Sequence, residues 1–283
     1  MGAIEEIILR GDVRGMRHLA PHLEPEYATD AAQFVMEHKG RVIITTGFYI
    51  LSAGQPETDG PPGAVAIGNA LAELGYDVSY VTDSVSLGAL ASVASQAHEI
   101  IEFPITNHRE SAEFAQAMIR DERPDLMISI ERAGISSDGI YRNMRSMDIS
   151  DHNAKIDHLF DQHPYSLGIG DGGNEIGMGN LMGHIRSVET LPDDPTSTRV
   201  NRLIIASVSN WGSYGLIAAL SLLSKRRLLP STQQEEEVIC RMVDSGAVDG
   251  ISTQRVYAVD GFSLGENRRT LERLNALLSE QGL

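Results

Sequence analysis

Acidic and amide side chains recur directly after short aliphatic or β-branched runs of this 283-residue sequence. In chain order they are Glu57 and Asp59, Glu131 and Asp138, Asp171 with Asn174 and Glu175, Asn210, and Asp260. If the runs are parallel strands, their carboxyl ends lie on one edge of the sheet, where ligands bind in open α/β folds. We therefore expect side chains that are far apart in the sequence to converge at that edge.

Carboxylates gathered at one edge repel each other unless a positive charge lies between them. These loops hold no surplus of Lys or Arg, so a hard divalent cation such as Mg²⁺, Mn²⁺ or Ca²⁺ is the expected partner. The predicted metal ligands are Glu57, Asp59, Asp171 and Glu175. The simpler alternative is that Glu57, Asp59 and Asp171 only cap the N-termini of helices.

Other nucleotide and nucleophile motifs are weak or missing. The stretch from Gly168 to Gly173 matches the dinucleotide fingerprint G-x-G-x-x-G, but Asp171 and Glu175 would then face the pyrophosphate. The sequence contains neither a P-loop nor a G-x-S-x-G nucleophile elbow. A site built from carboxylates is therefore the better interpretation.

Composition restricts the partners. A formal net charge of −16 repels phosphate backbones and anionic lipid, which argues against nucleic acid and membrane surfaces as partners. The single cysteine, Cys240, excludes an intramolecular disulfide and fits a reducing compartment. The Met1–Arg10 segment lacks the basic and apolar regions of a secretory signal. A small-molecule substrate and a cytoplasmic location are therefore expected.

The segments that must hold these residues alternate between two periodicities. Strands are predicted at Val42–Thr46, Val78–Val81, Glu99–Glu102, Leu126–Ile130, Tyr165–Ile169, Leu203–Ala206 and Arg255–Val259. Amphipathic helices are predicted around Ile67 to Leu74, Val85–Ala97, Ala112–Arg120, Ser213–Ser224, Gln233–Val243 and Leu264–Leu278. Such alternation predicts a single α/β domain, a three-layer, mostly parallel doubly wound sheet with helices on both faces.

The stretch 133–162 is the least regular part of the sequence, with turn residues and scattered charges. We expect it to form a lid over the site or a contact between subunits. A homo-oligomer is the corresponding expectation for the assembly, since most oligomers of soluble proteins contain identical chains.

The motifs around the acids resemble the D-glutamate cyclase family. The similar stretches are 55–64, 131–134, 138–145, 168–179 and 209–212, and the string from Gly170 to Glu175, Gly-Asp-Gly-Gly-Asn-Glu, is specific. The resemblance implies an α/β fold and a hydro-lyase that converts D-glutamate to 5-oxo-D-proline and water. It also implies a free-standing catalytic domain of the prokaryotic kind, because the larger animal enzymes carry an additional N-terminal region.

Cyclisation needs a deprotonated amine, an electrophilic γ-carboxyl group and protons for the departing oxygen. Glu131 or Asp138 is the predicted proton carrier, and Asn174 or Asn210 the predicted donor to the oxyanion. Arg132 is expected to hold the α-carboxylate, although an ion pair with Glu131 would explain it as well. The remaining predicted substrate contacts are Trp211, Gly172 and Gly173.

Two other functions stay open from the sequence. A metal-dependent phosphohydrolase is compatible with it, since acidic clusters on α/β edges handle phosphate and Gly-rich helix starts favour anions. A non-catalytic protein that senses a metal or a small acid would bind its ligand without turnover.

Overall fold

Six apolar runs form one parallel sheet in the computed structural model, which describes residues 1–283. Across the sheet the order is β5 (Glu99–Glu102), β4 (Asp77–Thr82), β1 (Arg41–Thr46), β6 (Leu126–Ile130), β7 (Ser166–Gly170) and β8 (Arg202–Ile205). The first strand, β1, lies in the middle of the sheet. Strands β4 and β5 follow on one side of it, and β6, β7 and β8 follow on the other side. The predicted doubly wound sheet is confirmed, and its topological switch point lies between β1 and β6.

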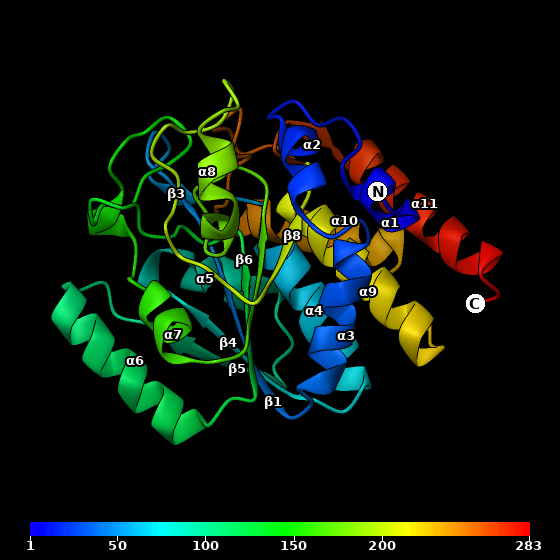
Figure 1. Ribbon diagram of the computed structural model, residues 1–283, viewed down its shortest axis with the longest axis horizontal. Helices are drawn as coiled ribbons and strands as arrows, with labels where there is room; N and C mark the ends of the chain where they lie inside the picture. The colour runs from blue at the N-terminus through cyan, green and yellow to red at the C-terminus, as the bar shows by residue number, and fades with distance from the viewer.

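Helices cover both faces of the sheet (Figure 1). One face carries α3 (Tyr27–Glu37), α4 (Pro61–Glu73) and α9 (Ser209–Ser224), and α9 packs against the other two. The opposite face carries α6 (His108–Glu122) and α7 (Asp157–Gln162), which pack against each other. The three-layer α/β architecture predicted from the sequence is therefore correct.

The strands are apolar on consecutive positions because both of their faces are buried. On β1, Val42 and Ile44 belong to the large core under α4 and α9, while Ile43 belongs to the smaller core under α6 and α7. All three side chains are fully buried. Ile44 pairs in register with Tyr80 on β4 and with Ile128 on β6, so the centre of the sheet is a continuous apolar layer.

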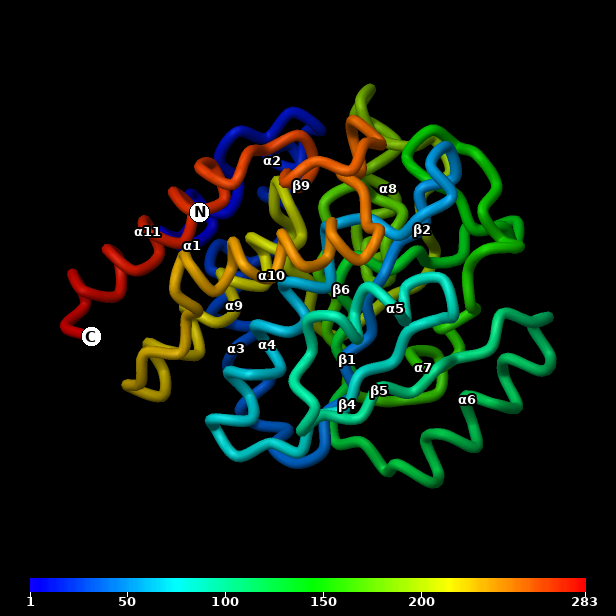
Figure 2. The backbone as a smooth tube through the Cα atoms, turned by 180° about the vertical axis from the view of Figure 1, so that it is seen from behind, coloured from blue at the N-terminus to red at the C-terminus, as the bar shows by residue number.

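The ends of the chain meet on the outer side of α9. Helices α1 (Ala3–Ile8) and α11 (Leu264–Glu280) pack against each other and against α9, side by side in both views (Figures 1 and 2). The remaining helices are α2 (Met16–Leu19), α5 (Ser84–Val93), α8 (Met182–Ile185) and α10 (Thr232–Ser245), with 3₁₀ turns η1 (Ala20–His22), η2 (Ser150–His152) and η3 (Met178–Leu181). The sequence patterns did not indicate α1, α2 or α3.

The predicted seventh strand, Arg255–Val259, is wrong. Only β9 (Ala258–Val259) is extended, and it pairs antiparallel with β10 (Phe262–Ser263) outside the main sheet. Val256 and Tyr257 are 43% and 49% exposed, so this β-branched run has no second layer to cover it. A second short hairpin, β2 (Tyr49–Ile50) with β3 (Gln55–Pro56), follows β1.

The irregular 133–162 stretch forms a compact loop with a small core of its own. Tyr141 and Ile149 are buried against Ala133 and Phe48. Isolated bridges between Ile135 and Tyr141 and between Arg142 and Asp148 hold it together. Its role as a lid or subunit contact stays a prediction.

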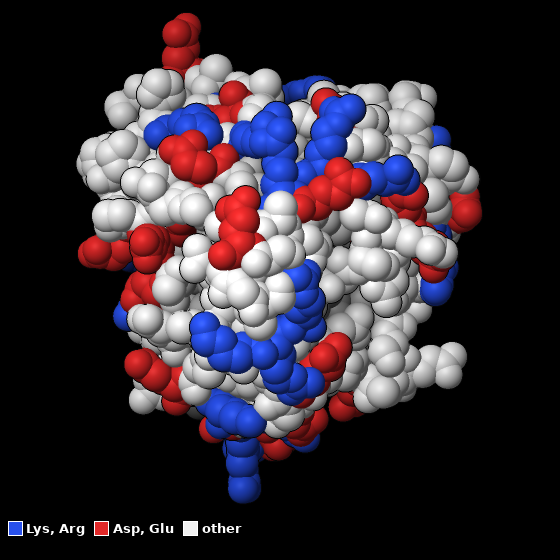
Figure 3. Space-filling model, turned by 90° about the vertical axis from the view of Figure 1, so that its right-hand side faces the viewer, with Lys and Arg blue, Asp and Glu red and all other residues white.

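The excess of negative charge is not only a surface property. On the face drawn in Figure 3, Lys and Arg lie beside Asp and Glu rather than forming a field of one sign. Five of the acids chosen from the sequence are at least 94% buried: Glu57, Asp59, Glu131, Asp171 and Glu175. No helix in the structure is both long enough and apolar enough to cross a bilayer. The buried acids therefore need an explanation other than solubility.

Candidate active site

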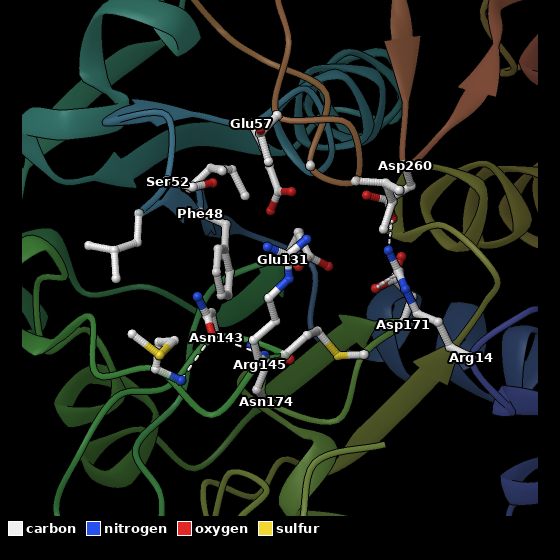
Figure 4. A pocket seen from close by; sticks show the side chains of 17 residues that line it. Arg14, Phe48, Ser52, Glu57, Glu131, Asn143, Arg145, Asp171, Asn174 and Asp260 are labelled. Atoms are coloured by element: carbon white, nitrogen blue, oxygen red, sulfur yellow. Dashed lines mark hydrogen bonds and ion pairs between the residues drawn. The ribbon is translucent and has the colours of Figure 1, made fainter. Parts of the chain in front are cut away.

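A cavity of about 480 Å³ lies among the loops that leave the carboxyl ends of β1, β6 and β7, at the switch point of the sheet. We call it the acidic cavity. Its charged and amide lining comes from six separate segments of the chain (Figure 4): Arg14, Glu57, Glu131, Asn143, Arg145, Asp171, Asn174 and Asp260. Phe48, Ile50, Leu51, Met144, Met147 and Ile251 form its apolar wall. The loops predicted to converge do converge.

Carboxylates form two overlapping groups at this cavity. Asp59, Asp171 and Asp260 each offer an oxygen within 4.8 Å of the others, and so do Glu131, Asp171 and Glu175. Asp171, the first residue after β7, belongs to both groups. The sequence placed most of these residues together correctly, since each follows a strand of the same sheet or its neighbouring hairpin.

Local backbone conformation brings the acids this close. Glu131 and Asp260 are left-handed, with φ of 44° and 52°, a conformation that costs a non-glycine residue about 1–3 kcal/mol. Gly250 is needed for a different reason. A Cβ atom there would lie 2.2 Å from Glu57 Oε2 and 3.0 Å from Asp260 Oδ1, so a larger residue would push these two acids apart.

One arginine lies within the cluster. Arg14 Nη1 is 2.5 Å from Asp171 Oδ1, and its Nη2 donates to Asp260 Oδ2 at 2.7 Å. Asp12 fixes the loop by accepting the backbone N–H groups of Arg14 and Gly15. Arg14 therefore supplies the positive charge for the group of Asp59, Asp171 and Asp260, whereas no basic side chain pairs with Glu131 or Glu175 in the structure.

The group of Glu131, Asp171 and Glu175 fits a divalent ion. Glu175 Oε1 and Asn174 Oδ1 are buried and have no hydrogen-bond partner, a condition that costs about 1–3 kcal/mol per group. Carboxylate oxygens within 4.8 Å of one another can surround an ion whose oxygen ligands lie at about 2.0–2.6 Å. The donor set consists of oxygens only, which suits Mg²⁺, Mn²⁺ or Ca²⁺.

Burial makes these acids hold protons more tightly. Burial raises the pKa of Glu131 well above that of a free glutamate, and nearby Glu175 and Glu57 raise it further. Burial, with Asp260 and Asp59, does the same to the pKa of Glu57. Burial raises the pKa of Asp59 to about 7. A carboxyl group in this cavity can therefore carry a proton near neutral pH.

Asp138 does not reach the cavity. It is exposed on the 133–162 loop, and its two oxygens accept from Arg142 Nη1 and Nη2 at 2.7 and 2.6 Å. The hydrogen bonds from Arg142 hold the pKa of Asp138 well below its usual range. Asp138 is therefore not placed where the predicted proton carrier would have to lie, because the chain has already left the sheet edge at this point.

Arg132 is a structural residue. Its Nη2 donates to Asp83 Oδ2 at 2.5 Å and to the Ala154 carbonyl, and its Nη1 donates to the Gly47 carbonyl. The side chain is 1% exposed and does not line the cavity. Arg132 is therefore not placed where the predicted contact with a substrate carboxylate would require it. It forms an ion pair, as the alternative interpretation expected, but the partner is Asp83 rather than Glu131.

Two further predicted contacts join helices instead of lining the cavity. Asn210 Oδ1 accepts the N–H groups of Gly60 and Gly63, and Nδ2 donates to the Thr58 carbonyl, so Asn210 ties α9 to the start of α4. Trp211 is buried, and its Nε1 donates to Asn267 Oδ1 at 2.7 Å. Neither side chain has a group free to bind a substrate.

Gly172 and Gly173 support Glu175 from behind. The Gly173 N–H donates to Glu175 Oε2 at 2.8 Å, and a Cβ at Gly172 would lie 2.6 Å from Glu175 Oε1. These glycines therefore position an acid and do not line the cavity themselves. Asp59 also has a structural task, since it accepts the N–H groups of Ser209 and Asn210 at the N-terminus of α9. The helix-cap interpretation is correct for Asp59.

The sequence analysis did not select four charged or amide residues that line the cavity. Asp260 follows a predicted strand and was recognised at the edge, although not as a site residue. Asn143 and Arg145 lie in the 138–145 stretch that resembles the family, but the sequence analysis gave them no role. Arg14 had no signal, because it comes from a loop whose position depends on packing. Arg145 is exposed at the cavity and makes no ion pair, which leaves its guanidinium available to a ligand.

Fold and site together define the class: a doubly wound α/β protein with a carboxylate-walled pocket for a small ligand at its switch point. Within that class, the chain belongs to the D-glutamate cyclase-like, C-terminal family, whose model matches residues 4–275. It is 36% identical over 276 residues to human "D-glutamate cyclase, mitochondrial", an alignment that covers 82% of this chain and 44% of the human protein. The chain thus spans less than half the length of that relative, and the family resemblance seen in the motifs is confirmed.

Proposed function

We propose that this protein is a hydro-lyase that cyclises D-glutamate to 5-oxo-D-proline with loss of water, assisted by a divalent metal ion. The supporting observation is the group of Glu131, Asp171 and Glu175, buried at the switch point, in which Arg14 pairs with Asp171 and no basic side chain pairs with Glu131 or Glu175. Membership of the D-glutamate cyclase-like family supports D-glutamate as the substrate, which the geometry alone would not identify.

Substrate binding is assigned to the 133–162 loop. Arg145 has a free guanidinium at the cavity and can bind a carboxylate through two N–H groups. Asn143, from the same loop, offers an amide beside it (Figure 4). Arg145 thus takes the role first expected of Arg132.

The metal ion would be held by Glu131, Asp171 and Glu175, and the side-chain oxygen of Asn174, Oδ1, lies close to them. When bound, the ion would withdraw electron density from a carboxyl oxygen and stabilise negative charge on it. Arg14 holds Asp171 and Asp260 in place through its two ion pairs. Asp59, occupied by three backbone N–H groups, is not needed as a ligand.

The reaction moves two protons from nitrogen to oxygen. The amine nitrogen forms a bond to the γ-carbon, one γ-oxygen leaves as water, and the ammonium group loses two protons in total. We assign the proton transfer to Glu57, which lines the cavity and belongs to neither candidate ligand group. Burial raises the pKa of Glu57 well above that of a free glutamate, so its carboxyl group can hold a proton where an exposed one would not.

The direct test incubates the purified chain with D-glutamate and follows 5-oxoproline, with Mn²⁺ or Mg²⁺ and again with EDTA. Turnover that needs the metal and fails with L-glutamate would support the proposal. A parallel assay measures phosphate release from small phosphate esters, the strongest rival reaction. No loss of D-glutamate with any divalent metal would refute the proposal, and metal-dependent phosphate release would favour the rival.

A further inference from the structure

A second cavity, of about 340 Å³, lies on another side of the molecule and shares no lining residue with the acidic cavity. It is bounded by α4, the end of α5, α9, α10 and the connection 228–230, which lie together in Figure 2. Val65, Val93, Leu228 and Val238 form an apolar part of its wall, and polar side chains form the rest. The proposed cyclase reaction does not use this cavity.

One acid in this wall has no partner. Glu235 lies in the first turns of α10, lines the cavity and is only 3% exposed. Both of its carboxylate oxygens are buried and have no hydrogen-bond partner. The Tyr214 hydroxyl on α9 lies nearby, but the pair does not reach hydrogen-bonding geometry. Burial raises the pKa of Glu235 to about 8, as expected for a carboxyl group with no cation against it.

Glu235 lies in the first turn of α10, where the positive end of the helix favours an acid, but that end does not require a buried one. A capping box between Ser231 and Gln234 already satisfies the start of α10. A buried carboxyl group without a partner destabilises the folded state, and an apolar side chain would pack here without that cost. Glu235 is therefore better explained by a ligand than by stability.

Charge and shape together restrict the ligand. Around the cavity, Glu73, Glu235 and Glu237 face a single basic residue, Arg241, and Glu73 is already paired with Arg226 outside it. An anion would be repelled, and one buried carboxylate is too few ligands for a metal ion. A neutral apolar molecule would leave Glu235 without a partner.

We propose that the second cavity binds a small organic ammonium ion, an amine with an apolar body, whose charged nitrogen contacts the Glu235 carboxylate. The apolar wall would bury the hydrocarbon part, and the single acid would fix the orientation, as in ligand pockets that combine a large apolar surface with few polar groups. The ammonium ion would supply the partner that Glu235 lacks.

Calorimetry with benzylamine as the probe, and with benzyl alcohol as its neutral match, tests this proposal. The wild-type chain is expected to bind benzylamine at least about tenfold more tightly than benzyl alcohol, which is the size of one buried charge-assisted hydrogen bond. Glu235→Gln should remove that preference. Glu237→Gln, two residues along the same helix and exposed, should keep it.

A second pair of variants locates the binding. Glu57→Gln changes the acidic cavity, which could also attract an amine. If benzylamine binds in the second cavity, this substitution should leave its binding unchanged. Ala66→Leu places a larger side chain in the wall of the second cavity and should block binding even if Glu235→Gln folds poorly. Equal affinity for the alcohol, or binding lost in Glu57→Gln and kept in Ala66→Leu, would overturn the proposal.

Discussion

Two groups of buried charged residues lie near the same edge of the sheet. They differ in whether positive and negative side chains are equal in number. Arg132 and Asp83 are each 1% exposed and form a pair of one positive and one negative group. Around the acidic cavity, six carboxylates lie near two arginines, of which only Arg14 pairs with any of them. Matched buried charges hold segments of the fold together, whereas an unmatched excess marks a place where a cation or a substrate has to enter.

The largest expected effect comes from changing the acid shared by both carboxylate groups. Asp171→Asn should reduce kcat/KM for D-glutamate at least about a thousandfold, or about 4 kcal/mol, because a ligand and the anchor of Arg14 are lost together. The thermal unfolding temperature, Tm, should be no lower than in the wild type, since the substitution removes one of several buried negative charges. Turnover within tenfold of the wild type would remove the functional distinction between the two regions.

The balanced pair should respond in stability instead. Arg132→Met keeps the volume but leaves Asp83 charged and buried, and it should cost about 3 kcal/mol of the free energy of unfolding, measured in urea. Arg109→Met, which breaks an exposed ion pair with Glu113, should change that free energy by less than about 0.5 kcal/mol. A similar result for both variants would contradict a structural role for Arg132.

A bound divalent metal ion should offset the excess negative charge of the acidic cavity. Mn²⁺ at about a hundred times its dissociation constant should stabilise the folded state by about 2.7 kcal/mol, which is roughly a 5 °C rise in Tm for a chain of this length. The rise should shrink as the pH falls from 8 to 6. Burial raises the pKa of Glu131 and Asp171, so protons occupy these groups at lower pH and compete with the ion. A rise of the same size in Asp171→Asn would place the metal elsewhere.

Arg145 offers a smaller, separable effect at the mouth of the cavity. Arg145→Ala should raise KM for D-glutamate about tenfold and leave kcat within about twofold, as expected when an interaction made equally in the ground and transition states is lost. Initial rates over a range of substrate concentrations measure the two constants. A fall in kcat at constant KM would instead assign Arg145 to the chemical step.

The smallest effect is expected at Asp138. It forms an exposed ion pair with Arg142, so Asp138→Asn should change kcat/KM by less than about twofold and stability by less than about 1 kcal/mol. Asp138 thereby serves as the matched control for Asp171, since both are acids that follow strands in the sequence. A large loss of activity would restore Asp138 as a catalytic candidate.

Local patterns decided much of the fold. The apolar runs from Val42 and from Leu126 are central strands because both of their faces are covered, and periodicity alone reveals this. The run at Arg255–Val259 also contains β-branched residues, yet it forms only a short hairpin since no helix covers it. The sequence analysis missed α1 and α2 because such short helices depend on packing. It also missed α3, an 11-residue amphipathic helix whose buried face its spacing could have revealed.

For the site, the sequence determined which loops meet, because the carboxyl ends of parallel strands share one edge whatever their spacing along the chain. It therefore located Glu57, Glu131 and Asp171 at the cavity, with Glu175 beside Asp171. Tertiary structure alone decided which charges are paired there: Arg132 points to Asp83, Arg14 reaches the cavity from a loop without a motif, and Arg145 lines it without an ion pair. The positions of the strands along the chain follow from local periodicity. Their order in the sheet and each side-chain contact depend on distances between segments that only the folded chain defines.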